Sequence, residues 1–281
     1  MSMSHDHDAL LFQRYGDQSK PHNIIWNPVT ELQIAHKSVR TFLPKPLPEG
    51  ALETMVAAAQ SASTGSALQQ WSLISVTDKA LKQKLSDTIA RTVPTDRIPW
   101  IEECSALLLW VADGSRSAEI TEENGEDAVV LDHLDSFLMA TVDTSLAAQN
   151  AALAAESMGL GFVYLGVMRN AAEEVADIVG LPPNSFIPFG MALGIPDPAR
   201  QSVQRPRLPQ SVVLHENTYN TDEGGEILAD YEEAYLSFRS GQRMRPRTWA
   251  ASVVEAMTSM DYMGGRQNLR RFVEKAGYKL K

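Results

Sequence analysis

The chain has 281 residues, of which 44% are hydrophobic and 21% charged, and it carries a formal net charge of -10 and one cysteine. This length and composition are typical of a globular protein with a sizeable core, arranged as one large domain or two small ones. The acidic balance argues against nucleic-acid partners, which select a basic face, and a lone thiol excludes an intrachain disulfide or a cysteine-based zinc site.

We expect residues 1–29 to form an N-terminal tail and an extended arm, followed by a single domain over residues 30–281. The polar start lacks the apolar run of a signal peptide, and no later stretch approaches the roughly 18 apolar residues of a membrane helix. The expectation is therefore a cytoplasmic protein without a membrane partner. The run His5-Asp6-His7-Asp8 offers metal-binding side chains, but a disordered tail is the favoured interpretation.

Hydrophobic spacing and turn residues predict an α+β fold. Helices are expected over residues 30–37 (with Thr30 as the cap), 49–61, 78–90, 131–158, 170–179, 223–239, 248–259 and 266–276. Strands are expected over residues 72–77, 106–111, 162–166 and 186–194. The proline-rich segment 41–48, the small polar segment 62–70 and the acidic segment 114–130 are expected to be loops, the last one solvated and mobile.

The helix over residues 131–158 gives the strongest signal. From Phe137 to Met158 it is apolar or small nearly all round and rich in alanine, which predicts a buried central helix that another helix can approach closely, and a candidate dimer contact. Gly159 is expected to end it. The pair Gly159-x-Gly161 does not indicate a dinucleotide-binding turn, because here a helix ends and a strand begins, the reverse of that fingerprint.

The sequence offers no convincing protein nucleophile and no metal site. It contains no His-Glu-x-x-His, no cysteine pair, no phosphate-binding lysine loop and no Gly-x-Ser-x-Gly elbow. Cys104 lies beside the apolar run Ala106 to Trp110, which favours a buried, unreactive thiol. A bound cofactor that carries the chemistry would account for these absences.

Two clusters of cations are candidates for binding an anion. His36-Lys37-Ser38-Val39-Arg40 places two cations and a hydroxyl within five residues, which suits either a phosphate clamp or a basic helix C-terminus matched to the helix dipole. Arg205-Pro206-Arg207-Leu208-Pro209 holds two arginines between prolines and suits either an anion site or a solvated loop. The residues alone leave both pairs of alternatives open.

Two further segments give weaker signals. The loop Ser63-Thr64-Gly65-Ser66-Ala67-Leu68-Gln69 supplies hydroxyls, backbone amides and a carboxamide that can meet phosphate oxygens or a heterocycle edge. The alternating cations Arg243, Arg245 and Arg247 favour a solvated loop when they are considered alone.

Several segments, in chain order, resemble the FMN-dependent nitroreductase superfamily. The first motif is His36-Lys37-Ser38-Val39-Arg40-Thr41-Phe42 followed by Pro46-Leu47, and the central helix contributes Asp143-Thr144 and Ala147-Ala148-Gln149-Asn150. The remaining segments that match are 155–161, 164–170, 205–209 and His215-Glu216-Asn217-x-Tyr219. Together they span roughly residues 30–280 and are similar to the oxygen-insensitive, NADPH-preferring branch of nitroreductases and flavin reductases.

The resemblance implies a nitroreductase-like fold, with a central, mostly antiparallel sheet flanked by helices, in a homodimer whose extended arms are exchanged. It implies that FMN takes electrons from NADPH, with NADH as a possible donor, in a ping-pong cycle. The electrons leave in pairs to a small-molecule acceptor, which can be a nitroaromatic, a quinone, an azo compound or free flavin. Since FMN carries this chemistry, no catalytic side chain is expected.

The resemblance also assigns roles to individual residues. The flavin phosphate, ribityl chain and pyrimidine edge are expected to contact His36, Lys37, Ser38 and Arg40. The polar loop contributes Ser63, Thr64, Ser66 and Gln69, from the other subunit. The isoalloxazine lies along Tyr164, Leu165, Gly166 and Val167. Arg205 and Arg207 complete the phosphate clamp, and Arg243 and Arg245 are candidates for the 2′-phosphate of NADPH.

Four departures from the family pattern concern the site. Lys37 stands where arginine is usual, Arg205 stands where lysine is common, and Val167 replaces the usual second glycine. The segment Thr95-Asp96-Arg97-Ile98-Pro99-Trp100 replaces a Gly-Gly-Gln segment that helps to line the cofactor pocket, which leaves the acceptor open. Two alternatives are therefore retained. One is a specialised flavin reductase that reduces enones or removes halogens, and the other is a flavin-binding carrier without turnover.

Overall fold

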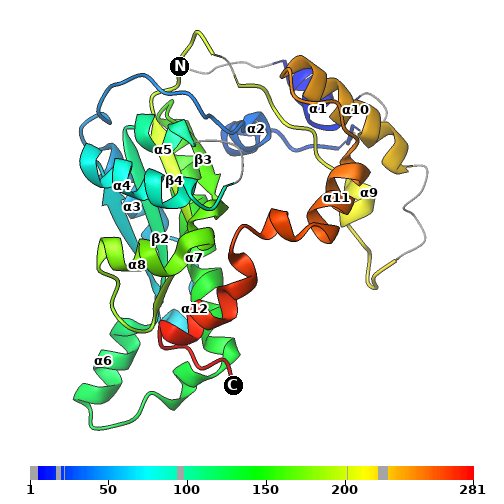
Figure 1. The fold of residues 1–281 in the computed structure, drawn as a ribbon. Helices are drawn as coiled ribbons and strands as arrows, with labels where there is room; N and C mark the ends of the chain where they lie inside the picture. Colours follow the sequence, from blue (N-terminus) through cyan, green and yellow to red (C-terminus); the bar gives the residue numbers. More distant parts are fainter. Residues whose placement is uncertain (1–5, 17–19, 22, 94–97, 201, 221–226) are drawn as a thin grey trace. The chain divides into compact units, whose positions relative to one another are not determined.

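A computed structural model describes residues 6–16, 20–21, 23–93, 98–200, 202–220 and 227–281 (Figure 1). The chain divides into two compact units. The first comprises Met1–Lys37 and Ser202–Tyr262, and the second comprises Ser38–Gln201 and Met263–Lys281. Each unit is described by itself.

The second unit is built on a four-stranded antiparallel sheet with the strand order β1-β2-β4-β3. Its strands are β1 (Trp71–Val76), β2 (Ala106–Asp113), β3 (Gly161–Leu165) and β4 (Ser185–Gly194). Its α-helices are α3 (Ala51–Gln60), α4 (Lys79–Ala90), α5 (Pro99–Glu103), α6 (Ser115–Glu123), α7 (Leu134–Ser157), α8 (Ala172–Val179) and α12 (Leu269–Lys275). Its short 3-10 helices are η1 (Gly65–Ala67), η2 (Val129–Asp132), η3 (Gly166–Ala171) and η5 (Arg266–Asn268). These elements confirm the predicted α+β class and the antiparallel sheet.

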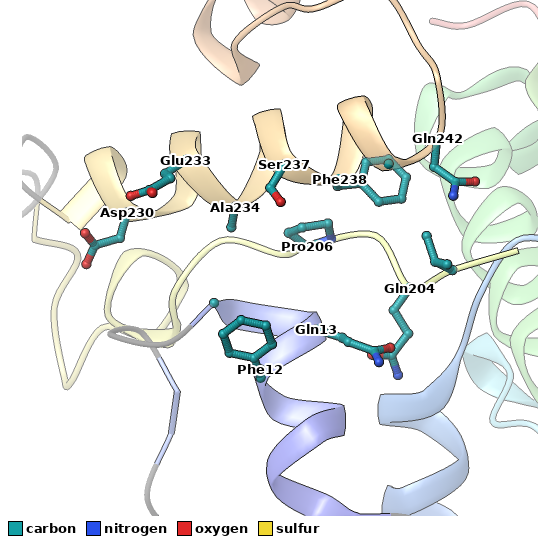
Figure 2. A pocket seen from close by; sticks show the side chains of 13 residues that line it. Phe12, Gln13, Gln204, Pro206, Asp230, Glu233, Ala234, Ser237, Phe238 and Gln242 are labelled. Atoms are coloured by element: carbon teal, nitrogen blue, oxygen red, sulfur yellow. The ribbon is translucent and has the colours of Figure 1, made fainter.

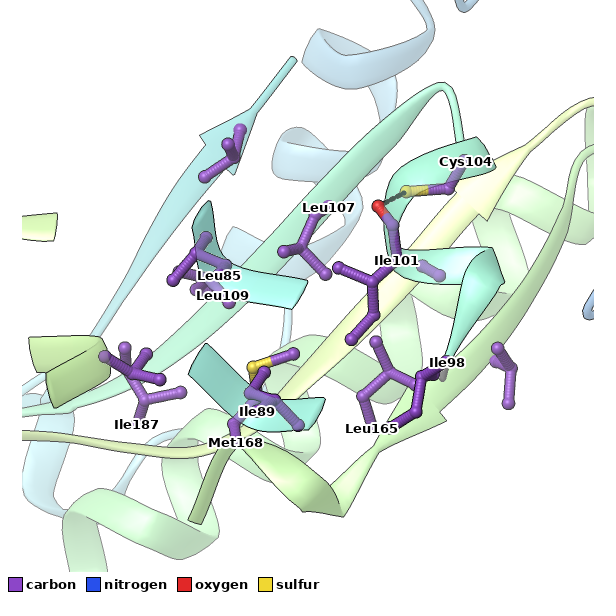
Figure 3. Close-up of a cluster of buried hydrophobic side chains, with 14 of the residues drawn as sticks. Leu85, Ile89, Ile98, Ile101, Cys104, Leu107, Leu109, Leu165, Met168 and Ile187 are labelled. Carbon is purple, nitrogen blue, oxygen red and sulfur yellow. Dashed lines mark hydrogen bonds between the residues drawn. The ribbon is translucent and has the colours of Figure 1, made fainter. Parts of the chain in front are cut away.

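Strand β2 is the centre of this unit, because both of its faces are buried. Leu108 and Trp110 pack with α3 and α7 on one face, while Leu107 and Leu109 pack with α4 and α5 on the other. Figure 3 shows the second cluster, where Leu85 of α4 and Ile101 of α5 lie against the odd-numbered side chains of β2. A strand covered on both faces explains why residues 106–111 form a nearly continuous apolar run rather than an alternating pattern.

Cys104 lies in the same cluster, at the end of α5. Its side chain is 1% exposed and its thiol donates to the carbonyl of Ile101 at 3.3 Å (Figure 3). Burial raises the pKa of Cys104 to about 11, so at neutral pH it is a protonated thiol rather than a nucleophile. This confirms the interpretation of a buried, unreactive cysteine.

Helix α7 has two different faces. Its alanines, among them Ala147 and Ala151, are buried against the sheet and α3, and Asn150 donates to the carbonyl of Ala58 in α3 at 3.2 Å. The opposite face exposes four apolar side chains at a spacing of four residues, namely Leu134, Leu138, Val142 and Leu146. The prediction that the helix is buried all round is therefore right for its alanine face only. Gly159, with φ 75°, follows its end as predicted.

The first unit is mostly helical. It contains α1 (His7–Tyr15), α2 (Pro28–Ala35), α9 (Gln210–Val213), α10 (Ile227–Gly241) and α11 (Trp249–Thr258). The 3-10 helix η4 (Met260–Met263) ends at the boundary with the second unit. Within the described ranges, no helix combines the length and hydropathy needed to cross a membrane.

Three local predictions are corrected. Residues 7–15 of the expected tail form α1, because the Asp6 carboxylate caps the backbone amides of Asp8 and Ala9. Residues 115–123 of the expected acidic loop form α6, which begins where the Asp113 carboxylate accepts from the amide of Ser115. The cap of α2 is Asn27, and Thr30 is its partner in a capping box.

Some predictions fall on residues that the structure does not describe. These are the first five residues of the tail with His5, Thr95-Asp96-Arg97 of the segment that departs from the family pattern, and residues 223–226 at the start of the helix expected over 223–239. The division into residues 1–29 and a single domain over 30–281 stays a prediction.

Candidate active site

The first motif crosses the boundary between the units, and its second half is held against β3. The amide of Val39 donates to the carbonyl of Phe162 at 2.8 Å, and Val39 is buried between the half-buried Ser38 and the exposed Arg40. Gly161 permits this approach, because a Cβ there would lie 2.7 Å from the Val39 side chain. The guanidinium of Arg40 lies 6.0 Å from the ring centroid of Trp100.

The segment Tyr164–Val167 follows directly, where β3 passes into η3. Tyr164 is 36% exposed, and its ring meets Phe162 and Phe189 edge-on. Its neighbour Leu165 is buried, since successive side chains of a strand point to opposite faces. Val167 is partly buried and packs on the core cluster that contains Leu165. The end of β3 therefore exposes the ring of Tyr164, and the sheet fixes the position of this ring and of the adjoining backbone.

The polar loop before β1 has an unusual backbone. Ser66, Ala67 and Gln69 have φ values of 50°, 57° and 52°, in the left-handed region that residues other than glycine seldom adopt. Ser63, Ser66 and Gln69 are exposed, and Thr64 is half-buried. Such strain persists only where the surrounding structure enforces it, and it clusters at ligand-binding sites.

Asp143 of α7 enforces this conformation. Its side chain is 1% exposed, and its carboxylate accepts from the amides of Gly65 at 2.8 Å and Gln70 at 3.4 Å, which flank the three residues with positive φ. A Cβ on Gly65 would lie 2.7 Å from the sulfur of Met139, so glycine lets the loop reach α7. The signal for this role was available in the sequence, because a carboxylate within the helix predicted to be buried must be paired when its side chain is buried.

Arg116 of α6 supports the same loop from its other side. Its guanidinium donates to the carbonyls of Gln69 at 2.8 Å and Trp71 at 2.7 Å, and it forms a salt bridge of 2.9 Å with Asp113. Sequence reasoning missed this residue, because it placed residues 114–130 in a solvated loop. Because these residues form helix α6, the guanidinium of Arg116 reaches the polar loop at Gln69.

The first unit holds the other half of the predicted phosphate clamp. His36 is half-buried at the end of α2, and Lys37, Arg205 and Arg207 are exposed. Neither Arg205 nor Arg207 forms a salt bridge with a carboxylate in the part of the chain that the structure describes. Partial burial and the neighbouring charge of Arg205 lower the pKa of Arg207. Two neighbouring cations without a carboxylate partner favour an anion as their partner.

Arg205 and Arg207 line a pocket of about 600 Å³ within the first unit. Aromatic side chains form much of its wall, among them Tyr231, Tyr235 and Trp249. Burial alone would raise the pKa of Tyr235, but hydrogen bonds from Ser252 and Arg239 and the nearby cationic charge bring it below its ordinary value. Among its lining residues are two arginines and no carboxylate, so the pocket is electropositive although the whole chain is acidic.

A second pocket of this unit, of about 610 Å³, has the opposite character. Figure 2 shows it between Phe12 and Gln13 of α1 and the side chains of α10, with Asp230 and Glu233 on its rim. Carboxylates at this position disfavour a phosphate. The volumes of the two pockets are nearly equal, so the charge of the lining, rather than the size, makes the pocket of Arg205 and Arg207 the candidate for the cofactor phosphate.

The arginines expected to meet NADPH have different surroundings. Arg243 and Arg245 are exposed, and the carbonyl of Arg245 accepts from the guanidinium of Arg239 at 2.8 Å. Arg247 forms a salt bridge with Glu255. A role for Arg243 and Arg245 toward NADPH stays a prediction, while the ion pair of Arg247 supports its omission from that site.

Each unit therefore brings together part of the predicted residues. In the second unit, Ser38 and Arg40 lie beside the strand that carries Tyr164–Val167, whereas the contacts that hold loop 63–69 run to α7 and α6. In the first unit, hydrogen bonds from the Arg14 side chain of α1 hold both the segment of His36 and Lys37 and the segment of Arg205 and Arg207.

Two family descriptions match the chain. Residues 34–195 match the Nitroreductase family, and residues 205–281 match the C-terminal domain of the Nitroreductase family. The FMN reductase (NADPH) of Bacillus subtilis is 33% identical over 258 residues, covering 90% of this chain and 98% of that protein. The NADPH-flavin oxidoreductase of Vibrio harveyi is 35% identical over 230 residues, covering 81% and 90%.

Solved structures agree with this result. The NfrA1 nitroreductase of B. subtilis has a TM-score of 0.80 and 32% identity, covering 89% of this chain and 99% of its own. NfrA1 of B. megaterium has a TM-score of 0.82 and 35% identity, covering 90% and 100%. The similarity therefore extends over both units.

The substitution Asp143→Asn tests the anchoring of the polar loop. We expect it to lower the free energy of unfolding by about 2 kcal/mol, because one carboxylate oxygen that accepts from a backbone amide is replaced by an amide group that cannot accept. Thermal and urea unfolding measure the effect. Asp135→Asn, at an exposed position of the same helix, is the matched control, and an equal, small change in both variants would contradict the anchoring role.

Proposed function

The chain belongs to the nitroreductase family, and we propose that it is an FMN-dependent NADPH oxidoreductase that passes electron pairs to small oxidised organic molecules in a ping-pong cycle. Its acceptors are nitroaromatics, quinones, azo compounds or free flavin. The observation that carries the proposal is the pair Arg205 and Arg207, two cations without a carboxylate partner among the described residues, in an acidic chain. Relatives named as NADPH-dependent flavin reductases support the choice of donor and cofactor.

The residues present fit FMN. A dianionic phosphate matches the cations Lys37, Arg205 and Arg207 through charge-assisted hydrogen bonds. It would also offset both the desolvation and the neighbouring charge of Arg205 that lower the pKa of Arg207. Because Lys37 is a point charge without the planar fork of arginine, the geometry of the clamp rests on the two arginines.

The other residues have matching tasks. Ser38 and Arg40, held beside β3 by the Val39 amide, would bind the ribityl chain and the pyrimidine edge. Tyr164 and the backbone through Gly166 would lie along the flavin ring, and Ser63, Thr64, Ser66 and Gln69 would hydrogen-bond from the polar loop. When bound, FMN supplies the ring that accepts a hydride from NADPH and returns an electron pair to the acceptor.

We further propose that the active protein is a homodimer whose interface includes the exposed face of α7. Leu134, Leu138, Val142 and Leu146 are 55%, 56%, 47% and 44% exposed and form one stripe along this helix. A continuous apolar stripe on a helix marks an interaction surface. The polar loop is tied to the same helix through Asp143, so a second copy on this face would be next to the residues assigned to the flavin.

The visible spectrum of the purified protein tests the function. We expect a flavin spectrum that bleaches when NADPH is added without oxygen and returns when a quinone or nitroaromatic is added. The same cycle should fail with NADPH if the protein is a flavin carrier without turnover. A protein that neither contains FMN nor takes it up contradicts the proposal.

The dimer is tested by the double substitution Leu138→Glu and Val142→Glu. Light scattering should give the mass of a dimer for the wild type and of a monomer for the variant, because two carboxylates would have to be buried without partners. Ile120→Glu, at a position that is 60% exposed on α6, is the control for added charge. A variant that keeps the dimer mass contradicts an interface on this face.

A further inference from the structure

Arg14 of α1 is a buried cation with an unusual set of partners. Its side chain is 5% exposed, and its guanidinium donates to the carbonyl of Arg205 at 2.7 Å, of Ile34 at 2.7 Å and of His36 at 2.6 Å. The carbonyl of Arg14 in turn accepts from the amide of Arg207 at 2.8 Å. One residue thus bonds to both segments that carry the cations of the phosphate clamp.

The end of α2 needs such a partner. The helix ends at Ala35, and the last carbonyl groups of a helix find no hydrogen-bond donor within it. A guanidinium offers five donors in one plane and a positive charge at the negative end of the helix dipole, so it can hold Ile34 and His36 together. The position of His36 and of the following Lys37 is therefore set by Arg14.

The segment after residue 202 depends on the same contacts. It is extended and contains Pro206 and Pro209, which lack an amide donor. Besides the two bonds to Arg14, a bond from the Gln204 side chain to the Ile34 carbonyl at 2.7 Å fixes it to α2. With Gln204 and Pro206 buried, the alternation of an extended chain leaves Arg205 and Arg207 exposed on the other side.

Arg14 lies outside the part of the chain that matches the family, which begins at residue 34. We infer that Arg14 is a positioning residue that fixes the spacing between Lys37 and the pair Arg205 and Arg207, and that α1 thereby sets the affinity for the cofactor phosphate. The inference rests on the proposed function, since it assumes that these cations bind the phosphate of FMN. Arg14 itself acts through them, because its donors are occupied by carbonyl groups.

The test compares FMN with riboflavin, which has the same ring and no phosphate. Apoprotein is titrated with each flavin by fluorescence quenching, for the wild type and for Arg14→Gln. We expect the Kd for FMN to rise about tenfold or more, the equivalent of one lost charge-assisted contact, while the Kd for riboflavin stays unchanged. Gln13→Ala, at the exposed neighbouring position of α1, is the matched control and should change neither value.

The outcomes separate the possible causes. An unchanged Kd for FMN in Arg14→Gln overturns the inference, and so does an equal loss for both flavins, which would mean a general structural role. If Arg14→Gln does not fold by circular dichroism, Arg14→Lys is used and is expected to show the same selective loss, because an ammonium cannot bridge three carbonyls in one plane. A wild type that binds neither flavin contradicts the proposed function and the inference with it, whereas tight wild-type binding of FMN leaves only the role of Arg14 at issue.

Discussion

The constraint on which this structure depends is the placing of positive charge in an acidic protein. The chain has 35 acidic and 25 basic residues, yet Arg205 and Arg207 lie close together and lack a carboxylate partner within the described residues. Like charges at short distance cost free energy unless an anion joins them. The segment that carries the two arginines is held in place by hydrogen bonds to Arg14 of α1 and by the bond from the Gln204 side chain to Ile34 of α2. An anion bound by both arginines would offset this cost.

The second unit supplies rigidity where the first supplies charge. Its sheet is buried on both faces at β2. This core fixes the end of β3, and a hydrogen bond to β3 fixes the motif at Ser38–Arg40. The polar loop holds three non-glycine residues in the left-handed region because a buried carboxylate on α7 binds Gly65 and Gln70 on either side of them. Stored strain of this kind keeps hydroxyls and amides in a fixed arrangement for a ligand, at the expense of stability.

Much of this could be predicted from the sequence. The continuous apolar run of β2 and the long alanine-rich run of α7 identified a strand and a helix, and the motif at residues 36–40 together with later segments indicated the family. What could not be predicted depends on partners distant in the chain. Arg14 has a role only through carbonyls of residues 34, 36 and 205, and Arg116 only through those of residues 69 and 71. Helix α1 was missed because its polar beginning resembles a tail, although Asp6 caps it.

Recognition of the cofactor phosphate by Arg205 and Arg207 is the property on which the proposed function depends. The most direct measurement is a calorimetric titration of the wild-type apoprotein with FMN and with riboflavin, at low and at high salt. Charge-assisted binding of a dianion predicts that FMN binds at least about a hundredfold more tightly than riboflavin, and that only the affinity for FMN falls as salt rises. Equal affinities for the two flavins, or a salt dependence shared by both, would contradict the assignment of Arg205 and Arg207 to the phosphate.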